Sequence, residues 1–288
     1  VVRKIFEAKG RPQDNPLIVH IADMKQLGDV SRSESADLQL LSHNFWPGPL
    51  SLILERSDRV AGAVSAGLDT VAVRMPDHPV ALELIRQAGV PIAAPSANRS
   101  GKPSPTKYQH VIDDLVGRID AVIRTSLRCR IGLESTVLDL SQGEPVILRP
   151  GGISKEVLEA VLQKPVLVAG EHQDFQVLRS PGTKYKHYSP NAPLILITGR
   201  PEKRKQVIGC LATYYKKHGY LVKVLSHNGK QTISESEKQR LATNLYSWLR
   251  DMDQRGVDLI LAEEVDSSGL GFAVMNRLRK AATRIIHV

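Results

Sequence analysis

The sequence predicts an α/β protein built from two parts, a mixed-sheet α+β domain followed by a small Rossmann-like parallel α/β domain. Three observations support this prediction. Short β-branched segments with fewer helical segments fill the first 170 residues, without a strict βαβ alternation. Strands and helices then alternate regularly after residue 193. A segment bounded by prolines separates the two patterns, so we expect domains at 1–170 and 194–288 joined by a linker at 171–193.

Each element of the first domain is predicted from its local pattern. Apolar spacing with a period near 3.6 predicts helices, and they are expected at 2–8, 34–45 ("ESADLQLLSHNF"), 79–88, 105–116 and 154–162. Short apolar or β-branched runs predict strands, and these are expected at 16–21, 50–55, 70–76, 90–98, 120–125, 135–140 and 145–151. Gly10 and Pro12 end the first helix, and "WPGP" at 46–49 ends the second.

The second domain has a simpler rhythm. Its strands are expected at 193–199, 221–226 and 257–265, and its helices at about 201–218, 234–254 and 271–283. Three strands separated by helices predict a three-layer parallel sheet, because parallel neighbours need crossover connections.

Composition narrows the class of protein. The chain has 288 residues with 42% hydrophobic and 24% charged content, which is typical of a globular protein. Two cysteines supply neither a disulfide framework nor a Cys-rich zinc site and fit a reducing compartment, so a cytoplasmic location is expected. No apolar run approaches the roughly 20 residues that cross a bilayer, so no membrane contact is expected.

The net charge of +9 is unevenly distributed. Residues 1–170 carry 20 basic and 19 acidic side chains, a balance of +1, whereas residues 194–288 carry 16 and 9, a balance of +7. The excess either makes the second domain a solubilising surface or lets it meet an acidic partner such as RNA.

The first candidate site is a loop that follows the first helix. Lys9, Arg11 and Asn15 lie in "AKGRPQDNP", and two cations two residues apart on a turn can hold one phosphate from two sides. The alternative is that cations at a helix C-terminus only favour the helix dipole.

Arg74 is the second candidate, because it ends the apolar strand "TVAVR". Strand alternation places it on the face of Ala72 rather than that of Val71 and Val73. A half-buried arginine needs an acidic partner, either a protein carboxylate or the carboxylate of a ligand.

Two further clusters combine hydroxyl groups with Gly and Pro. The loop "APSANRSGKPSPT" (94–106) carries Ser96, Asn98, Ser100 and Ser104, which suit a phosphate or a sugar unless this is a plain surface loop. In 132–152, Ser135 and Thr136 open a strand and Arg149 closes the next one.

The sequence lacks the motifs that several kinds of catalysis require. The sequence contains no P-loop, no nucleophile elbow and no H-E-x-x-H motif, and "GLGFAV" (269–274) lacks the third glycine of the dinucleotide fingerprint. Its histidines show no metal-ligand spacing, so no protein metal site is expected. The remaining cations and hydroxyls suit nucleotide binding without a P-loop.

The motifs "KIFEAKGRPQDNPLIVHI", "FWPGPLSLIL", "VAVRMPDHP", "PIAAPSANRSGKPSPT", "ESTVLDL" and "ILRPGGIS" occur in this order. Together they resemble the threonylcarbamoyl-AMP synthase family, whose catalytic domain has the YrdC-like fold. "SPGTKYKHYSP" (180–190) and the αβ unit after it resemble the long, two-domain form of that family. The resemblance covers nearly the whole chain.

The resemblance implies an enzyme, a nucleotidyltransferase, that condenses L-threonine, bicarbonate or CO2 and ATP into threonylcarbamoyl-adenylate and pyrophosphate. The adenylate then passes to proteins that modify tRNA with threonylcarbamoyladenosine. Mg²⁺ is expected to bind mainly through ATP, since no carboxylate cage is visible in the sequence.

The resemblance also implies roles for individual residues. Lys9 and Arg11 correspond to the family's catalytic Lys-x-Arg pattern. Contacts to ATP are implied for Lys9, Arg11, Asn15, Thr70, Ser96, Asn98, Ser104, Arg149 and Tyr188. Contacts to threonine are implied for His20, Arg74, Ala94 and Ser135.

The segment 180–190 is expected to cover the active site. Pro181 and Pro190 restrict its path, Tyr185, His187 and Tyr188 can lie over a nucleotide, and its lysines can approach the phosphates. This predicts a lid that slows loss of the labile adenylate to water.

The family's first strand and its Pro-Thr-(x)-Thr-Val-Tyr-Gly-Leu loop are not in this sequence. Since Val1 is not an initiator methionine, we expect that the sequence is truncated at its N-terminus. A real deletion would remove part of the pocket and compromise catalysis.

Two other classes of function compete with the synthase. A non-catalytic RNA-binding module of the same fold would explain the charge, although 5% aromatic content offers few stacking surfaces. A carbamoyltransferase of hydrogenase maturation would need Cys-rich zinc fingers, which two cysteines cannot form.

Overall fold

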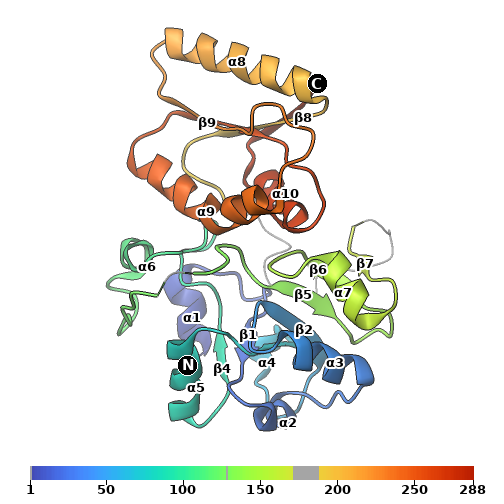
Figure 1. The fold of residues 1–288 in the computed structure, drawn as a ribbon. Coiled ribbons are helices and arrows are strands. Elements are labelled where there is room, and N and C mark those ends of the chain that lie inside the picture. The colour runs from blue at the N-terminus through green and yellow to red at the C-terminus, as the bar shows by residue number, and fades with distance from the viewer. Residues whose placement is uncertain (1, 128, 171–187) are drawn as a thin grey trace. The chain divides into compact units, whose positions relative to one another are not determined.

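The computed structural model describes residues 2–127, 129–170 and 188–288 (Figure 1). The chain forms two compact units, one of Val1–Ser96 with Glu134–Tyr185 and one of Ala97–Leu133 with Lys186–Val288. Residues 97–133, which the sequence pattern groups with the first domain, are therefore part of the second compact unit. Residues 171–187 of the expected linker lie outside the described residues.

The first unit is built on a seven-stranded mixed sheet with the strand order β4-β1-β3-β2-β5-β6-β7. The strands are β1 (Ile18–His20), β2 (Leu50–Glu55), β3 (Thr70–Arg74), β4 (Ile92–Ala94), β5 (Thr136–Asp139), β6 (Val146–Arg149) and β7 (Leu167–Val168). The helices are α1 (Val2–Lys9), α2 (Leu27–Val30), α3 (Ala36–Phe45), α4 (Gly62–Ser65), α5 (Pro79–Ala88) and α7 (Lys155–Leu162), with a 3₁₀ turn at Met24–Gln26.

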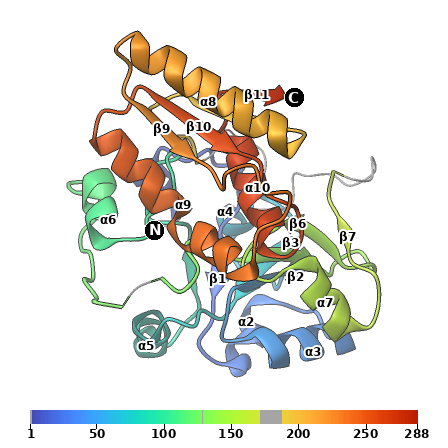
Figure 2. The ribbon, with the colours of Figure 1, turned by 45° about the horizontal axis from the view of Figure 1, so that its top comes forward.

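The helix boundaries of this unit follow from local chemistry. Ser35 caps α3 by accepting a hydrogen bond from the Leu38 N–H at 3.1 Å. Helix α5 begins with Pro79 at its first turn and ends at Gly89, whose φ of 67° suits glycine. Helices α3 and α7 lie side by side in both views, where Lys164 Nζ reaches Asp37 at 2.5 Å (Figures 1 and 2).

The register of the sheet separates two faces. Ala94, Ile18, Ala72 and Ile53 are cross-strand neighbours in one row, so their side chains share a face. The next row, with Val19, Val73 and Leu52, belongs to the opposite face. The first face carries a buried apolar cluster of Ile18, Ile53, Ala72, Val137, Val146 and Leu148.

The second unit contains a four-stranded parallel sheet in the order β11-β8-β10-β9. Its elements are α6 (Tyr108–Leu115), β8 (Leu194–Thr198), α8 (Pro201–Lys217), β9 (Val222–Leu225), α9 (Glu235–Gln254), β10 (Leu259–Glu263), α10 (Leu270–Ala281) and β11 (Arg284–His287). Helix α8 packs on one face of this sheet, and α9 and α10 pack on the other (Figures 1 and 2).

The fold prediction is confirmed with two corrections. A fourth strand, β11, extends the parallel sheet beyond the three strands that were expected. The expected strand at 120–125 is wrong, because this segment is irregular and leaves Ile123 58% exposed. A β-branched run forms a strand only where a neighbouring strand can pair with it. Among the described residues, no helix is long and apolar enough to cross a membrane.

Candidate functional site

The residues predicted to contact the ligand threonine lie in the first unit, on one face of the seven-stranded sheet. His20 at the end of β1 is the cross-strand partner of Arg74 at the end of β3. Ala94 in β4 is paired with Ile18, two residues before His20. Since paired residues and residues two apart share a face, these side chains all belong to the face that carries the apolar cluster.

Arg74 has a backbone carbonyl as its near partner and a carboxylate only at the limit of an ion pair. Its Nε donates to the backbone oxygen of Gly48 at 2.8 Å, and its Nη2 lies 4.0 Å from Asp77 Oδ1. Burial lowers the pKa of Arg74, the Asp77 carboxylate raises it, and the positive charge of Arg149 lowers it further. Two guanidinium groups that repel each other on one sheet face favour an anion between them.

The loop that presents the Gly48 carbonyl requires glycine at that position. A Cβ on Gly48 would come within 2.2 Å of the Phe45 oxygen, a contact that real structures do not show. The Gly48 N–H donates to Met75 O at 2.9 Å, which fixes the loop against the end of β3. The "WPGP" motif therefore helps to position Arg74.

His20 is neutral at physiological pH. Burial and the positive charge of Arg74 lower its pKa to about 4. Its Nδ1 is buried and has no hydrogen-bond partner among the described residues. A buried polar atom without a partner is costly, so His20 offers a contact that a bound ligand can satisfy.

A buried hydroxyl pair lies further along the same face. Ser51 Oγ and Ser135 Oγ are 2.8 Å apart, and Arg149 Nη2 donates to Ser135 O at 3.0 Å and Ser135 Oγ at 3.2 Å. A Cβ on Gly151 would come within 2.4 Å of Glu134 O, so glycine is needed where the chain passes this cluster. Ser51 was not among the predicted residues, although a serine inside the apolar strand "LSLILE" is a signal.

The residues predicted to bind the phosphates of ATP lie before the start of β1. Lys9 is buried at the end of α1 and donates through Nζ to Ser96 O at 2.5 Å. Arg11 donates to Asn15 O at 3.1 Å and to Asn15 Oδ1 at 2.7 Å, so this turn is pre-formed. The sheet thus brings Lys9 to Ser96, across 87 residues of sequence.

Thr70 lies at the opposite end of β3 from Arg74. Their Cα atoms are four residue steps apart along the strand, or about 13 Å at roughly 3.3 Å per step. Thr70 shares the face of Arg74 by the period of two, but the structure does not bring the two side chains into contact. The site face therefore extends along the whole length of β3.

Three of the residues predicted to contact ATP belong to the second unit. Asn98 is buried and donates through Nδ2 to Arg99 O and Lys102 O, both at 2.9 Å, which stabilises its own loop. Ser104 is also buried. Tyr188 is 4% exposed, stacks on Tyr246 with ring centroids 5.3 Å apart, and lies under the Arg277 guanidinium at 5.2 Å. The remaining aromatic and basic residues of the predicted lid, 184–187, lie outside the described residues.

Comparisons with known proteins show that both parts of this chain match known protein families. The family model described as "Telomere recombination" matches residues 1–151, and that described as "Threonylcarbamoyl-AMP synthase, C-terminal domain" matches residues 153–283. The threonylcarbamoyl-AMP synthase of Pyrococcus abyssi is 46% identical over 295 residues, covering 100% of this chain and 86% of that protein. That of Bacillus subtilis is 47% identical, covering 98% and 83%.

Solved structures agree with the sequence comparison. A crystal structure of the Pyrococcus abyssi protein in complex with L-threonine matches with a TM-score of 0.89 and 45% identity, covering 100% of this chain and 86% of that one. The chain therefore belongs to the threonylcarbamoyl-AMP synthase family, in its two-domain form.

Proposed function

We propose that this chain condenses L-threonine, bicarbonate or CO2 and ATP into threonylcarbamoyl-adenylate and pyrophosphate. The observation that carries the proposal is the pair of His20 and Arg74 at the ends of adjacent strands, with Arg149 close enough to depress the pKa of Arg74. Relatives that are 46–47% identical bear the name of this enzyme, and one was crystallised with L-threonine.

Threonine binds through its carboxylate to Arg74 in this proposal. A guanidinium with Asp77 only at 4.0 Å keeps donors for a bidentate carboxylate. The unpartnered Nδ1 of His20 meets the hydroxyl or the ammonium group of threonine. A site that hydrogen-bonds a hydroxyl rejects an analogue without it, because the buried group is then left unpaired. Ala94 and Ser135 complete the threonine contacts.

ATP is held by cations at its phosphates. Lys9 and Arg11 act on the triphosphate as the catalytic pair, together with Arg149. Fixed cations stabilise the charge that builds on the phosphate oxygens and on the leaving pyrophosphate. Within the first unit, the hydrogen-bonding contacts to ATP are assigned to Asn15, Thr70 and Ser96. The roles that the resemblance implies for Asn98, Ser104 and Tyr188 stay predictions.

The reaction has two bond-forming steps. The threonine amine attacks CO2, loses a proton to solvent or to a substrate, and becomes a carbamate. A carbamate oxygen then attacks the α-phosphorus of ATP, and the bond to pyrophosphate breaks. Holding the substrates in a reactive geometry supplies much of the acceleration.

Mg²⁺ is proposed to enter with ATP. Its oxygen ligands would be those of the phosphates and water, since Mg²⁺ is usually bound with substrate phosphates and keeps several waters. Such an ion neutralises phosphate charge, while the contacts of this chain remain those of its Lys, Arg and hydroxyl groups.

Downstream, the adenylate is proposed to pass to proteins that transfer the threonylcarbamoyl group to tRNA in the cytoplasm. Residues 194–288 carry 16 basic and 9 acidic side chains, which would suit a contact with tRNA.

The test is pyrophosphate release with ATP, threonine and bicarbonate, together with detection of the adenylate by mass spectrometry. It is done with this chain and with the chain extended by the family's Pro-Thr-(x)-Thr-Val-Tyr-Gly-Leu segment. We expect release that needs both threonine and bicarbonate. Arg11→Ala is expected to lower it strongly, while the control Arg32→Ala, on an exposed side chain, leaves it unchanged. No threonine-dependent release from either form would contradict the proposal.

A further inference from the structure

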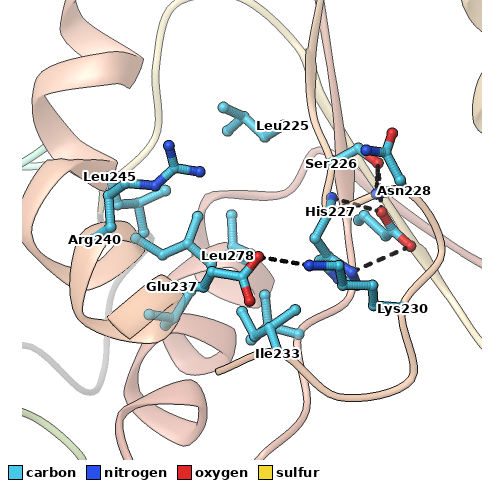
Figure 3. A pocket seen from close by; sticks show the side chains of 14 residues that line it. Leu225, Ser226, His227, Asn228, Lys230, Ile233, Glu237, Arg240, Leu245 and Leu278 are labelled. Carbon is cyan, nitrogen blue, oxygen red and sulfur yellow. Dashed lines mark hydrogen bonds and ion pairs between the residues drawn. The ribbon is translucent and has the colours of Figure 1, made fainter. Parts of the chain in front are cut away.

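The second unit contains a cavity of about 160 Å³ that the proposed reaction does not use. It lies at the carboxyl ends of the parallel strands β9 and β10, and helices α9 and α10 close it (Figure 3). Open parallel α/β sheets bind their ligands at this edge. An engineered cavity of about 150 Å³ in another protein takes up benzene, so this one has room for a small molecule.

One wall of the cavity is a pre-formed polar loop. The Glu263 carboxylate is fully buried and accepts from Ser226 Oγ at 2.5 Å and from the His227 N–H at 3.0 Å. Arg204 lies behind it, 3.4 Å from Glu263 Oε1, and donates to Lys230 O at 2.8 Å. Because both ends of the loop 226–230 are tied to buried charges, its polar groups are fixed before any ligand arrives.

Two acceptors on this wall accept no hydrogen bond among the described residues, although one of them, Glu263 Oε1, has the Arg204 guanidinium beside it. They are His227 Nδ1 and Glu263 Oε1, both buried and 3.8 Å apart. His227 Nε2 lies 2.6 Å from the carbonyl oxygen of Glu264, which can only accept, so Nε2 carries a proton. In the tautomer with a single proton on Nε2, Nδ1 is an acceptor. A donor such as an ammonium group would satisfy this acceptor pair.

The mouth of the cavity carries charges of both signs. Lys230 Nζ and Glu237 Oε1 are 2.8 Å apart, and the hydrogen bond from Lys230 lowers the pKa of Glu237 to about 2. Arg240 follows Glu237 by one turn of α9, and its exposed guanidinium makes no ion pair with a carboxylate in the described part of the chain. Figure 3 shows Arg240 on the wall opposite His227 and Asn228.

The third wall is apolar. It is made of aliphatic side chains from the end of β9, the segments just before α9 and just after β10, and the two helices, namely Leu225, Ile233, Leu241, Leu245, Val265, Val274 and Leu278. Binding an aliphatic group here is favourable by roughly 25 cal/mol for each Å² of apolar surface removed from water. The cavity therefore offers a cation, buried acceptors and an apolar wall within one small volume.

We propose that this cavity binds a free aliphatic α-amino acid. Its carboxylate pairs with Arg240, its ammonium group faces the acidic side at Glu237 and Glu263, and its side chain packs on the apolar wall. Each carboxylate already has a cation beside it, Lys230 for Glu237 and Arg204 for Glu263, which leaves Arg240 for an anionic group of the ligand. The buried acceptors favour a ligand that also carries a donor, which a fully ionised phosphate lacks.

Isothermal titration of the intact protein with L-leucine tests the proposal. We expect one site per chain with a dissociation constant at or below the millimolar range. L-leucinamide, which lacks the carboxylate, and 4-methylpentanoate, which lacks the ammonium group, should each bind at least tenfold more weakly. Failure of both L-leucine and L-valine to bind, or equal binding of either analogue, would overturn the proposal.

Variants locate the site. Arg240→Ala should abolish L-leucine binding, and the control Arg279→Ala, an exposed arginine on α10, should preserve it. Binding that survives Arg240→Ala contradicts the assignment. Arg74→Ala should leave L-leucine binding intact, which separates this cavity from the proposed threonine site. Leu241→Trp should fill the cavity and block binding, and its melting temperature checks that the variant is folded.

Discussion

The two units differ in whether a buried cation has a carboxylate close to it. In the second unit, Arg250 lies 2.7 Å from Asp114, whose side chain is fully buried, and Lys238 lies 2.7 Å from Asp266. Burial alone would raise the pKa of Asp114, but Arg250 and Lys102 hold it below its usual value. These cations are compensated within the protein, and they tie α9 to neighbouring segments of its own unit.

In the first unit, Arg74 has a backbone carbonyl at 2.8 Å and Asp77 at 4.0 Å, and its pKa is lowered by burial and by Arg149. The difference teaches how to separate structural from functional arginines. A buried cation with a buried carboxylate beside it stabilises the fold, whereas a half-buried cation that faces another cation is suited to an anionic ligand.

The largest expected effect breaks the compensated pair. Asp114→Ala leaves the Arg250 guanidinium buried without its carboxylate, which should lower the free energy of unfolding by about 3–5 kcal/mol. Denaturant titration measures this loss. As a control, Asp58→Ala removes an exposed partner of Arg32 and should cost no more than about 1 kcal/mol. Equal losses in the two variants would show that Asp114 and Arg250 are not a structural pair.

Arg74→Met should act on binding rather than on stability. We expect the KM for threonine to rise roughly 10- to 100-fold, since a hydrogen bond to a charged group contributes about 1.5–3 kcal/mol. The free energy of unfolding should change by less than about 1 kcal/mol, because Arg74 has no close carboxylate to leave unpaired. Steady-state kinetics measures the KM for threonine, and denaturant titration measures the free energy of unfolding. A destabilisation as large as that of Asp114→Ala would place Arg74 with the structural cations.

His20 is expected to make the stability of the protein depend on pH. Its folded pKa of about 4 lies below the ordinary 6.5, so the unfolded chain binds the proton first as the pH falls. Stability is therefore present above pH 6.5 and is lost progressively as the pH falls towards 4. At pH 5 the loss from this group should be about 2 kcal/mol relative to pH 8. His20→Gln should remove this part of the pH dependence in denaturant titrations, whereas His43→Gln, on an exposed residue, should not. An unchanged pH profile for His20→Gln would mean that His20 is not buried in its neutral form.

The smallest expected effect concerns the hydroxyl pair. Ser51→Ala removes the 2.8 Å contact with Ser135 Oγ but leaves the Arg149 contacts to Ser135, so we expect a loss of about 1 kcal/mol. Thermal and denaturant unfolding measure it. A loss above about 3 kcal/mol would indicate that Ser51 holds the whole cluster together.

Local patterns made most elements of the fold predictable. The period of "LSLILE" and the Pro79 and Gly89 boundaries of α5 report directly on backbone preferences, and both elements form where they were expected. The segment 120–125 is also rich in β-branched residues but forms no strand, and local sequence does not reveal which runs find a pairing partner. Strand β11 was missed although Ile285 and Ile286 are β-branched; the strand has four residues at the end of the sequence, and its pairing with β8 is a long-range contact.

The site needed more than local patterns. Strand alternation correctly placed Arg74 on the face of Ala72, and family resemblance supplied the roles of residues such as His20 and Ser135. The pairing of β2 with β5, which brings Ser51 to Ser135 across 84 residues, depends on long-range register. No sequence pattern encodes that register by itself, so Ser51 was not predicted.

The central claim is that Arg74 is the anion-binding cation of the threonine site. The most direct test compares the binding of L-threonine and L-threoninamide, which lacks the carboxylate charge, to the wild-type protein and to Arg74→Met. We predict that the wild type prefers threonine roughly 10- to 100-fold and that Arg74→Met binds both ligands equally weakly. If Arg74→Met still prefers threonine by the wild-type factor, another group holds the carboxylate and the account is wrong.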